Sequence, residues 1–142
     1  MTLDEKRACL RGLWEARDAL GTLCQVAAQH KPPMLETLGL LVAGVVTNIQ
    51  DAAEAVEGPA WVSNALEGGH GIPPLPSQVH LLRAHIRAAH AMAVGLVAMI
   101  LMGTEGQART DCEEWTGQAM RHIRTAAAAA GDPIPNPGGF TT

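Results

Sequence analysis

The sequence SQVHLLRAHIRAAHAMAVGLVAMILMG, residues 77–103, is the longest apolar stretch of the chain. Apolar residues recur in it at intervals of three or four, the spacing that lines one face of an α-helix. Ser77 follows a proline-rich stretch and is predicted to cap the helix, and Gly103 is predicted to end it in a left-handed conformation. One long helix over residues 77–103 is therefore the expected centre of the fold.

The second half of this helix is apolar on every face from Ala88 onward. It must therefore be covered by protein, by a partner or by lipid. A membrane span needs about 20 apolar residues. Arg87 and Glu105 bracket a shorter uncharged run, which also includes His90 and Gly95. We therefore expect a buried core helix and no membrane span.

An amphipathic helix is predicted over residues 3–29, ahead of this centre. Thr2 and Glu5 have the spacing of a capping box, in which each side chain bonds the backbone N–H of the other residue. Lys6 falls among other charged residues and is assigned to the solvent face, where local ion pairs form. The prolines that follow Lys31 end this helix.

Two more helices are predicted around the centre. One covers residues 34–56, where Gly39 and Gly44 are expected to let the central helix approach closely. The other is expected to begin with Thr110 as its cap, with residues 104–109 either as a turn or as the frayed start of this helix, and to end at Gly131. An aromatic content of only 3% also favours closely spaced helices over sheets.

These elements predict an all-α fold, a four-helix up-and-down bundle with a long crossover loop over residues 57–76 between helices 2 and 3. The loop is interpreted as a strap that closes one end of the core, with a ligand lid as the alternative. The single domain is expected to span residues 1–131. A flexible proline-rich tail over residues 132–142 follows, which becomes ordered only if Ile134 or Phe140 docks. The surplus of apolar surface on the central helix also predicts a homodimer.

Charge is distributed unevenly in this small acidic protein. The net charge is −4, and residues 32–76 carry five acids without any lysine or arginine. Such a negative segment repels phosphates, so no nucleic-acid partner is expected. The three cysteines include no CxxC pair, which indicates reduced thiols in a cytoplasmic protein.

The sequence contains no recognisable catalytic, cofactor-binding or metal-binding motif. The leading hypothesis is therefore a non-enzymatic interaction protein, such as an adaptor, a chaperone-like protein or an accessory factor. It would bind a protein partner or a second copy through a methionine-bearing apolar groove and the acidic second helix. The residues assigned to this interface are Asp51, Glu54, Met92, Met99 and Met102.

Two alternative functions stay open. The first is a bundle that binds a small apolar ligand between helices 2, 3 and 4, with a histidine as the polar contact. The residues assigned to that pocket are Val45, Ile49, His85, His90 and Trp115. The weaker alternative is a metal-dependent enzyme that uses His85, His90 and His122. No metal ligand or cofactor is assigned, because histidines spaced by five on a helix do not converge on one ion.

Overall fold

The computed structural model describes residues 1–65 and 71–136. Within these residues the chain forms five helices and no strand, which confirms the all-α prediction. The helices are α1 (Leu3–His30), α2 (Leu35–Glu57), α3 (Trp61–Ala65), α4 (Pro76–Gly103) and α5 (Gly106–Ala129). The four long helices lie close to the ranges expected from the apolar periodicity.

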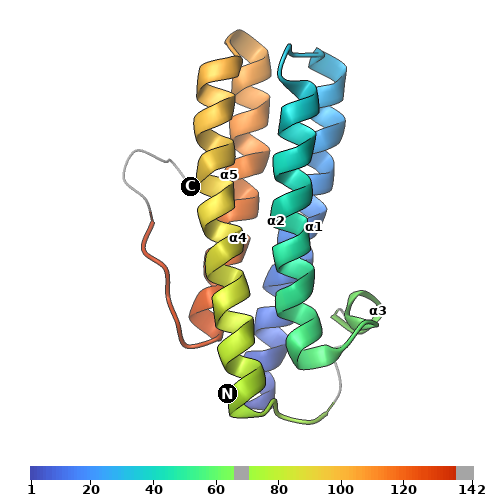
Figure 1. Ribbon diagram of the computed structural model, residues 1–142, viewed down its shortest axis with the longest axis vertical. Coiled ribbons are helices and arrows are strands. Elements are labelled where there is room, and N and C mark those ends of the chain that lie inside the picture. The colour runs from blue at the N-terminus through green and yellow to red at the C-terminus, as the bar shows by residue number, and fades with distance from the viewer. Residues whose placement is uncertain (66–70, 137–142) are drawn as a thin grey trace.

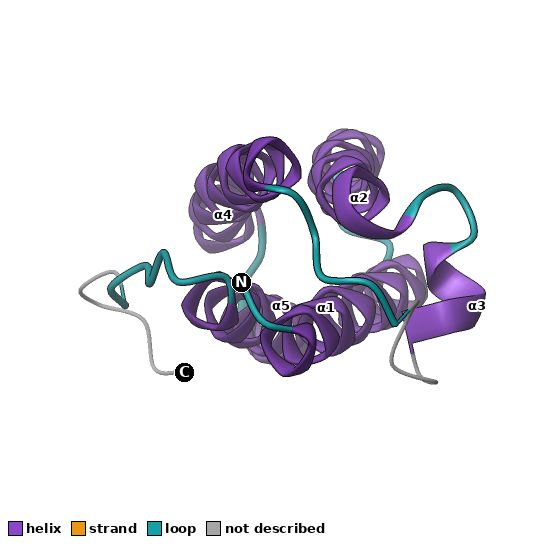
Figure 2. Cartoon of the chain, turned by 90° about the horizontal axis from the view of Figure 1, so that it is seen from below, coloured by secondary structure: helices purple, strands orange, loops and turns teal. Residues whose placement is uncertain are grey.

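The four long helices lie side by side, and each runs antiparallel to the long helix before it (Figure 1). Seen end-on, α2 and α4 form one layer, and α1 and α5 form the other (Figure 2). The most extensive contacts are between α1 and α5 and between α2 and α4. Of these two pairs, α1 and α5 are the first and last helices of the described chain, whereas α2 and α4 are successive long helices joined by residues 58–75.

The two ends of the molecule differ in how the helices are joined. At the loop end, the top of Figure 1, short connections at residues 31–34 and 104–105 join α1 to α2 and α4 to α5. At the opposite, strap end, residues 58–75 lead from α2 to α4 and include α3. We call residues 58–75 the strap. The long crossover expected between the second and third long helices is thus present.

Helix α1 begins as the sequence predicts. The Thr2 hydroxyl accepts a hydrogen bond from the Glu5 backbone N–H at 3.1 Å, and Glu5 Oε1 accepts one from the Thr2 N–H at 2.7 Å. These two bonds satisfy N–H groups that would otherwise lack partners at the start of a helix. The bond from the Thr2 backbone also holds the pKa of the Glu5 carboxyl below its ordinary value.

The bounds predicted for α4 agree with the structure to within one residue, but the predicted roles of Ser77 and Gly103 at its two ends are wrong. The helix begins at Pro76, and the Gln78 side chain rather than the Ser77 hydroxyl makes the end contact, accepting from the Leu75 N–H at 2.7 Å. Proline is well suited to this first position because it has no N–H to satisfy. Gly103 is not left-handed. Its missing side chain instead makes room for Met34, whose Cγ would lie 2.6 Å from a Cβ at this position.

The prediction that Thr110 caps the last helix is also wrong. Helix α5 already begins at Gly106, whose φ of 63° only glycine adopts readily. The Thr110 hydroxyl lies inside the helix and donates to the Gly106 carbonyl at 3.3 Å. The other end agrees with the prediction, because Gly131 has a φ of 74° just beyond the helix.

Two glycines mark the closest contacts between helices. A Cβ at Gly12 of α1 would lie 3.0 Å from the His122 carbonyl oxygen of α5. A Cβ at Gly44 of α2 would overlap the Met92 methyl group of α4. This contact is with the end of a side chain and not with the backbone of α4, so a close backbone approach at Gly44 stays a prediction. The prediction for Gly39 is wrong, because nothing lies within 4 Å of its Cβ position.

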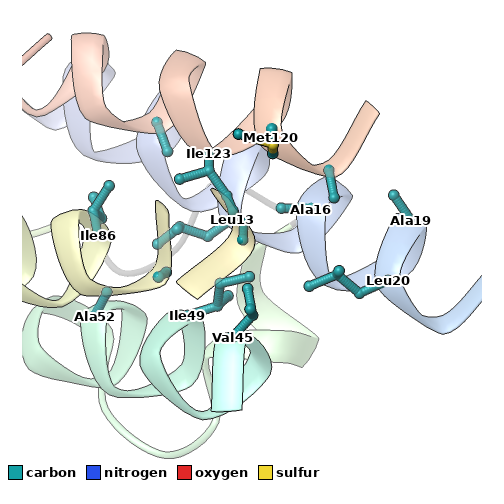
Figure 3. Close-up of a cluster of buried hydrophobic side chains, with 14 of the residues drawn as sticks. Leu13, Ala16, Ala19, Leu20, Val45, Ile49, Ala52, Ile86, Met120 and Ile123 are labelled. Atoms are coloured by element: carbon teal, nitrogen blue, oxygen red, sulfur yellow. The ribbon is translucent and has the colours of Figure 1, made fainter. Parts of the chain in front are cut away.

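The hydrophobic core lies between the two layers and receives side chains from all four long helices (Figure 3). Leu13 of α1, Ile49 of α2, Ile86 of α4 and Ile123 of α5 are all buried there. Burying an aliphatic side chain of this size contributes about 1.5–3 kcal/mol. This shared core fixes the helices relative to one another and so determines which faces remain exposed.

A buried ion pair closes the strap end, so the assignment of Lys6 to the solvent face is wrong. Lys6 Nζ lies 2.6 Å from Glu57 Oε2, and the two side chains are only 2% and 0% exposed. Lys6 also donates to the Ile72 carbonyl of the strap at 3.2 Å. Trp61 of α3 is buried in the core. The strap thus removes Lys6 from water, and a desolvated ammonium needs a carboxylate partner.

The C-terminal segment up to residue 136 is held against α4. Arg83 Nε donates to the Ala130 carbonyl at 2.7 Å, and Arg87 bonds both carboxylate oxygens of Asp132 at 2.9 and 2.8 Å. Ile134 then packs against the core. Docking of Ile134 is one of the conditions under which the sequence predicts order in this segment. Phe140 and the rest of residues 137–142 lie outside the described residues.

Candidate interaction surface

Apart from Glu36 in the first turn of α2, the halves of α2 and α4 nearest the loop end carry no charged residue. Residues 37–50 of α2 and 88–104 of α4 contain no Asp, Glu, Lys or Arg. The two runs lie next to each other, because Gly44 meets Met92 in the space between the helices. We call this half of the layer the uncharged layer. Depletion of charge is a property of the centres of protein interfaces.

Three large apolar side chains are exposed on the uncharged layer near the loop end. Leu40 is 70% exposed, Leu101 is 42% exposed and Met102 is 88% exposed. The other solvent-facing residues of α4 in this half are small, namely Ala91, Gly95 and Ala98. Small side chains allow the backbone of a partner to come close, so this surface is suited to another helix.

Exposed apolar residues also occur at the strap end. They are Ile72, Leu75 and Leu81. They are spread over a proline-rich connection and the first turns of α4, within a half of the helix that carries charges. Scattered apolar residues of this kind are normal on protein surfaces.

The predicted methionine groove is only partly open. Met92 is half-buried between α2 and α4, where its Sδ accepts a hydrogen bond from Asn48 Nδ2 at 3.2 Å. Met99 is also half-buried. Of the three methionines assigned to a partner, Met102 is therefore the one that the described structure leaves freely accessible.

The acidic part of the predicted interface lies apart from the apolar part. Asp51 and Glu54 are exposed on α2, beyond the uncharged run and toward the strap end. Met102 lies level with the first residues of α2, since Gly103 contacts Met34. At about 1.5 Å per residue, Asp51 and Met102 are separated by about 24 Å along the helix axis. The two parts would have to contact different regions of one partner, or two partners.

The residues assigned to a ligand pocket have different environments. Val45 and Ile49 are fully buried and point into the core (Figure 3). His85 is half-buried, and Trp115 is half-buried against the core. None of these four residues, nor His90, lines either of the two clefts described below.

His90 is buried on α4, and its Nε2 atom has no hydrogen-bond partner among the described residues. Burial lowers the pKa of His90, and the positive charges of Arg124 and Arg87 lower it further. The imidazole is therefore neutral at physiological pH. A neutral side chain in this position contributes hydrogen bonding but no charge to a binding site.

Two histidines instead form pairs that join α1 to α5. His122 Nδ1 lies 3.0 Å from Glu15 Oε2, and His30 Nε2 lies 2.8 Å from Asp111 Oδ2. Across residues 1–65 and 71–136, no group of three or more His, Cys, Asp or Glu side chains is arranged to hold a metal ion. The geometry therefore gives no support to the metal-enzyme alternative.

The larger of two clefts, about 450 Å³, lies at the loop end between residues 30–33 and 102–109. Two of its three cationic side chains already have partners within the chain, and the third, Lys31, is exposed to solvent. His30 is paired with Asp111, and Arg109 Nη2 donates to the Leu101 carbonyl at 2.7 Å. These groups close the helix ends, so they are not available as contacts for a ligand.

The second cleft, about 320 Å³, lies between α1 and α2. Leu20, Val42 and Val46 give it apolar walls. Arg17 and further polar residues of α1 also line it. Sequence reasoning missed this cleft, and the available signal was the small Gly21 at a position where α1 faces α2.

The three cysteines differ in accessibility. Cys9 and Cys112 are fully buried, whereas Cys24 is half-buried and lines the second cleft. Burial raises the pKa of Cys9 to about 12. Burial and, to a lesser extent, Asp111 raise the pKa of Cys112. Nucleophilic cysteines need the opposite shift, so neither buried thiol is suited to catalysis.

Helix α4 is long enough and apolar enough to cross a membrane, judged by its 28 residues and their composition. In its most apolar window, 39% of the residues are buried inside the protein. A central helix of a water-soluble protein passes the same test, so this property is weak support for a membrane span.

No protein family, curated protein or solved structure matches this chain. The function is therefore argued from the geometry of the uncharged layer and of the clefts.

Proposed function

We propose that this protein is a non-enzymatic interaction protein built as a four-helix up-and-down bundle that works as a homodimer. The uncharged layer of α2 and α4 forms the contact between the two copies. The acidic residues nearer the strap end remain available to a basic protein partner.

The observation that carries this proposal is the coincidence of two uncharged runs on adjacent helices. Residues 37–50 and 88–104 lie next to each other, and Leu40, Leu101 and Met102 are exposed on the surface they form. A contiguous apolar patch on a soluble protein marks an interaction site. Methionine and leucine adapt well to the surface of a partner.

Charge complementarity favours a second copy as the partner of this layer. In a two-fold contact the same patch lies on both subunits, so the runs 37–50 and 88–104 of the two copies meet without burying a charge, and the exposed Glu36 lies just outside them. If the two copies lie antiparallel to each other, only the loop-end halves of their α2–α4 layers overlap. Asp51 and Glu54 of the two copies then point away from the contact, which avoids repulsion between like charges.

The acidic surface is a separate part of the proposal. Residues 32–76 contain no lysine or arginine, and Glu57 is engaged with the buried Lys6. Asp51 and Glu54 are thus exposed acids on α2 without a basic residue nearby in sequence. Such a surface attracts a basic partner and increases its association rate. The basic partner that we propose is a lysine-rich segment of another protein.

Substitution within the uncharged layer tests the dimer. We expect the double variant Leu40→Glu, Leu101→Glu to weaken self-association at least about a hundredfold, because it buries unpaired carboxylates in the contact. Sedimentation velocity over a range of concentrations measures this change. The matched control is Leu81→Glu, an exposed leucine at the strap-end half of the same helix, which should leave the association unchanged. Equal association of all three proteins would exclude the uncharged layer as the contact.

A second measurement tests the acidic surface separately. The variant Asp51→Lys, Glu54→Lys should bind a synthetic lysine-rich peptide less tightly than the unmodified protein, while its self-association stays the same. Fluorescence anisotropy of the labelled peptide reports binding. Equal binding by the variant would remove the acidic surface from the proposal and leave the dimer intact.

A further inference from the structure

The cleft between α1 and α2 lies on a different side of the molecule from the uncharged layer. Its walls are Leu20 of α1 and Val42 and Val46 of α2, and its volume is about 320 Å³. Small-molecule sites are typically concave, mainly apolar and supplied with a few polar groups. This cleft is at the lower end of the usual size range for such sites.

The cleft exists because the contact between α1 and α2 is filled unevenly. Toward the strap end, α3 lies beside α1 and contacts both α1 and α2 (Figure 2). Its Trp61 is buried in the core. Farther along α1, the residues that face α2 include Gly21 and Cys24, which are small. Nothing lies within 4 Å of the position of a Cβ at Gly21. The small residues at this position leave the space beside Leu20, Val42 and Val46 unfilled.

Arg17 lies at the strap-end side of this cleft and has an unsatisfied donor. Its Nε atom is shielded from solvent and has no hydrogen-bond partner among the described residues. A buried polar atom without a partner costs about 1–3 kcal/mol. The Arg17 side chain also lines the cleft, so its guanidinium is a candidate hydrogen-bond donor for a bound ligand.

We propose that this cleft binds a small amphiphile with a carboxylate head and an apolar chain, such as a medium-chain monocarboxylate. The carboxylate accepts hydrogen bonds from the Arg17 guanidinium, whose planar shape matches it. The chain lies over Leu20, Val42 and Val46 and extends toward Gln25. From Arg17 to Gln25 the helix rises about 12 Å, which matches the length of such a chain.

Asp18 is the one acid that lines the cleft, and it opposes an anionic ligand. It is exposed, so water and salt screen its charge, whereas the Nε atom of Arg17 is shielded. Arginine therefore determines the charge preference of the site. This inference goes beyond the proposed interaction function. Val42 and Val46 belong to the run 37–50, but Val42 is buried and Val46 is half-buried at the cleft, so neither is one of the exposed residues of the uncharged layer.

Cys24 provides a natural reporter of occupancy. It is half-buried in the cleft, whereas Cys9 and Cys112 are fully buried. The rate at which a disulfide reagent such as dithionitrobenzoate modifies Cys24 in mildly alkaline buffer should fall when the cleft is filled. A Cys24→Ser variant, which should lack the reactive thiol, verifies that the signal comes from this residue.

The experiment titrates octanoate, octanol and octylamine separately, with calorimetry alongside the thiol reaction. We expect octanoate to protect Cys24 and to bind most tightly, followed by octanol and then octylamine. Arg17→Met should reduce octanoate affinity about tenfold and leave octanol affinity unchanged, because it removes the charge-assisted bonds only. The control Arg11→Met changes an exposed arginine on the same helix that does not line the cleft, and should have no effect.

Gly21→Leu keeps the proposal testable if the Arg17 variant is poorly folded. A leucine there fills open space, so it should block octanoate and slow the modification of Cys24 while the protein stays folded. Absence of octanoate binding to the wild-type protein would overturn the proposal. So would tighter binding of octylamine than of octanoate, or equal octanoate affinity in the wild-type protein and the Gly21→Leu variant.

Discussion

The strap end and the loop end of this molecule differ in how completely each is closed. At the strap end, the buried pair of Lys6 and Glu57 and the buried Trp61 seal the helices within one chain. At the loop-end half, both described clefts are open and Leu40 and Met102 are exposed. We therefore expect the strap end to contribute most to stability, whereas the proposed dimer contact and the proposed carboxylate cleft lie toward the loop end and the proposed acidic surface lies nearer the strap end.

The largest effect on stability should come from removing one partner of the buried Lys6–Glu57 ion pair at the strap end. Lys6→Met leaves the Glu57 carboxylate buried without its partner, so the free energy of unfolding should fall by about 3–5 kcal/mol. Chemical denaturation measures this loss. The double variant Lys6→Met, Glu57→Met should recover most of it, because the buried charge is removed altogether. A single variant as stable as the wild type would mean that the pair does not seal this end.

An intermediate effect on stability should distinguish the face of α1 at Gly12, which is tightly packed, from the face at Gly21, which is open. Gly12→Leu forces a side chain against the His122 carbonyl of α5 and should destabilise the protein by about 1–3 kcal/mol or more. Gly21→Leu places the same side chain in open space and should be neutral or slightly stabilising, because leucine favours helix more than glycine does. Thermal unfolding of both variants makes the comparison. Equal melting temperatures would contradict the difference in packing.

The smallest of these effects is a loss of stability at acidic pH. Hydrogen bonds from Arg87 and from His30 hold the pKa of Asp132 and of Asp111, respectively, below the ordinary value. The unfolded chain therefore binds more protons, so this stabilisation is complete above about pH 4 and is lost as the pH falls through the folded pKa values. Both carboxylates are accessible to solvent, which keeps the effect modest.

The variants Asp132→Asn and Asp111→Asn test this prediction. Each should show a melting temperature that depends less on pH below about pH 4 than that of the wild type. Asp132 also fixes the segment that carries Ile134, so its variant should be the more affected of the two. Circular dichroism melts across the acidic range measure both. Parallel profiles for all three proteins would show that neither ion pair contributes.

The helices could be predicted from the sequence because their information is local. The periodic apolar residues of 77–103 and the reciprocal pair of Thr2 and Glu5 depend on neighbours within one or two turns. The predicted starts at Ser77 and Thr110 failed because another residue nearby, Gln78 or Gly106, supplied the end geometry. Such competition between adjacent candidates is decided by the backbone rather than by residue type.

The functional surfaces could be predicted only in part. The uncharged run of α4 is visible in the sequence, so the exposed Met102 could be identified there. The burial of Lys6 could not be predicted, because Glu57 is distant in sequence and only the packing of α1 against α2 brings the two side chains together. The cleft beside Arg17 depends on the spacing of two helices, which no local pattern records.

The most direct test of the central claim is the mass of the unmodified protein in solution, measured by light scattering after size-exclusion chromatography. If the uncharged layer is covered by a second copy, the mass at high micromolar concentration is twice the 14.9 kDa of one chain. A mass that stays at that of a single chain at this concentration would contradict the claim.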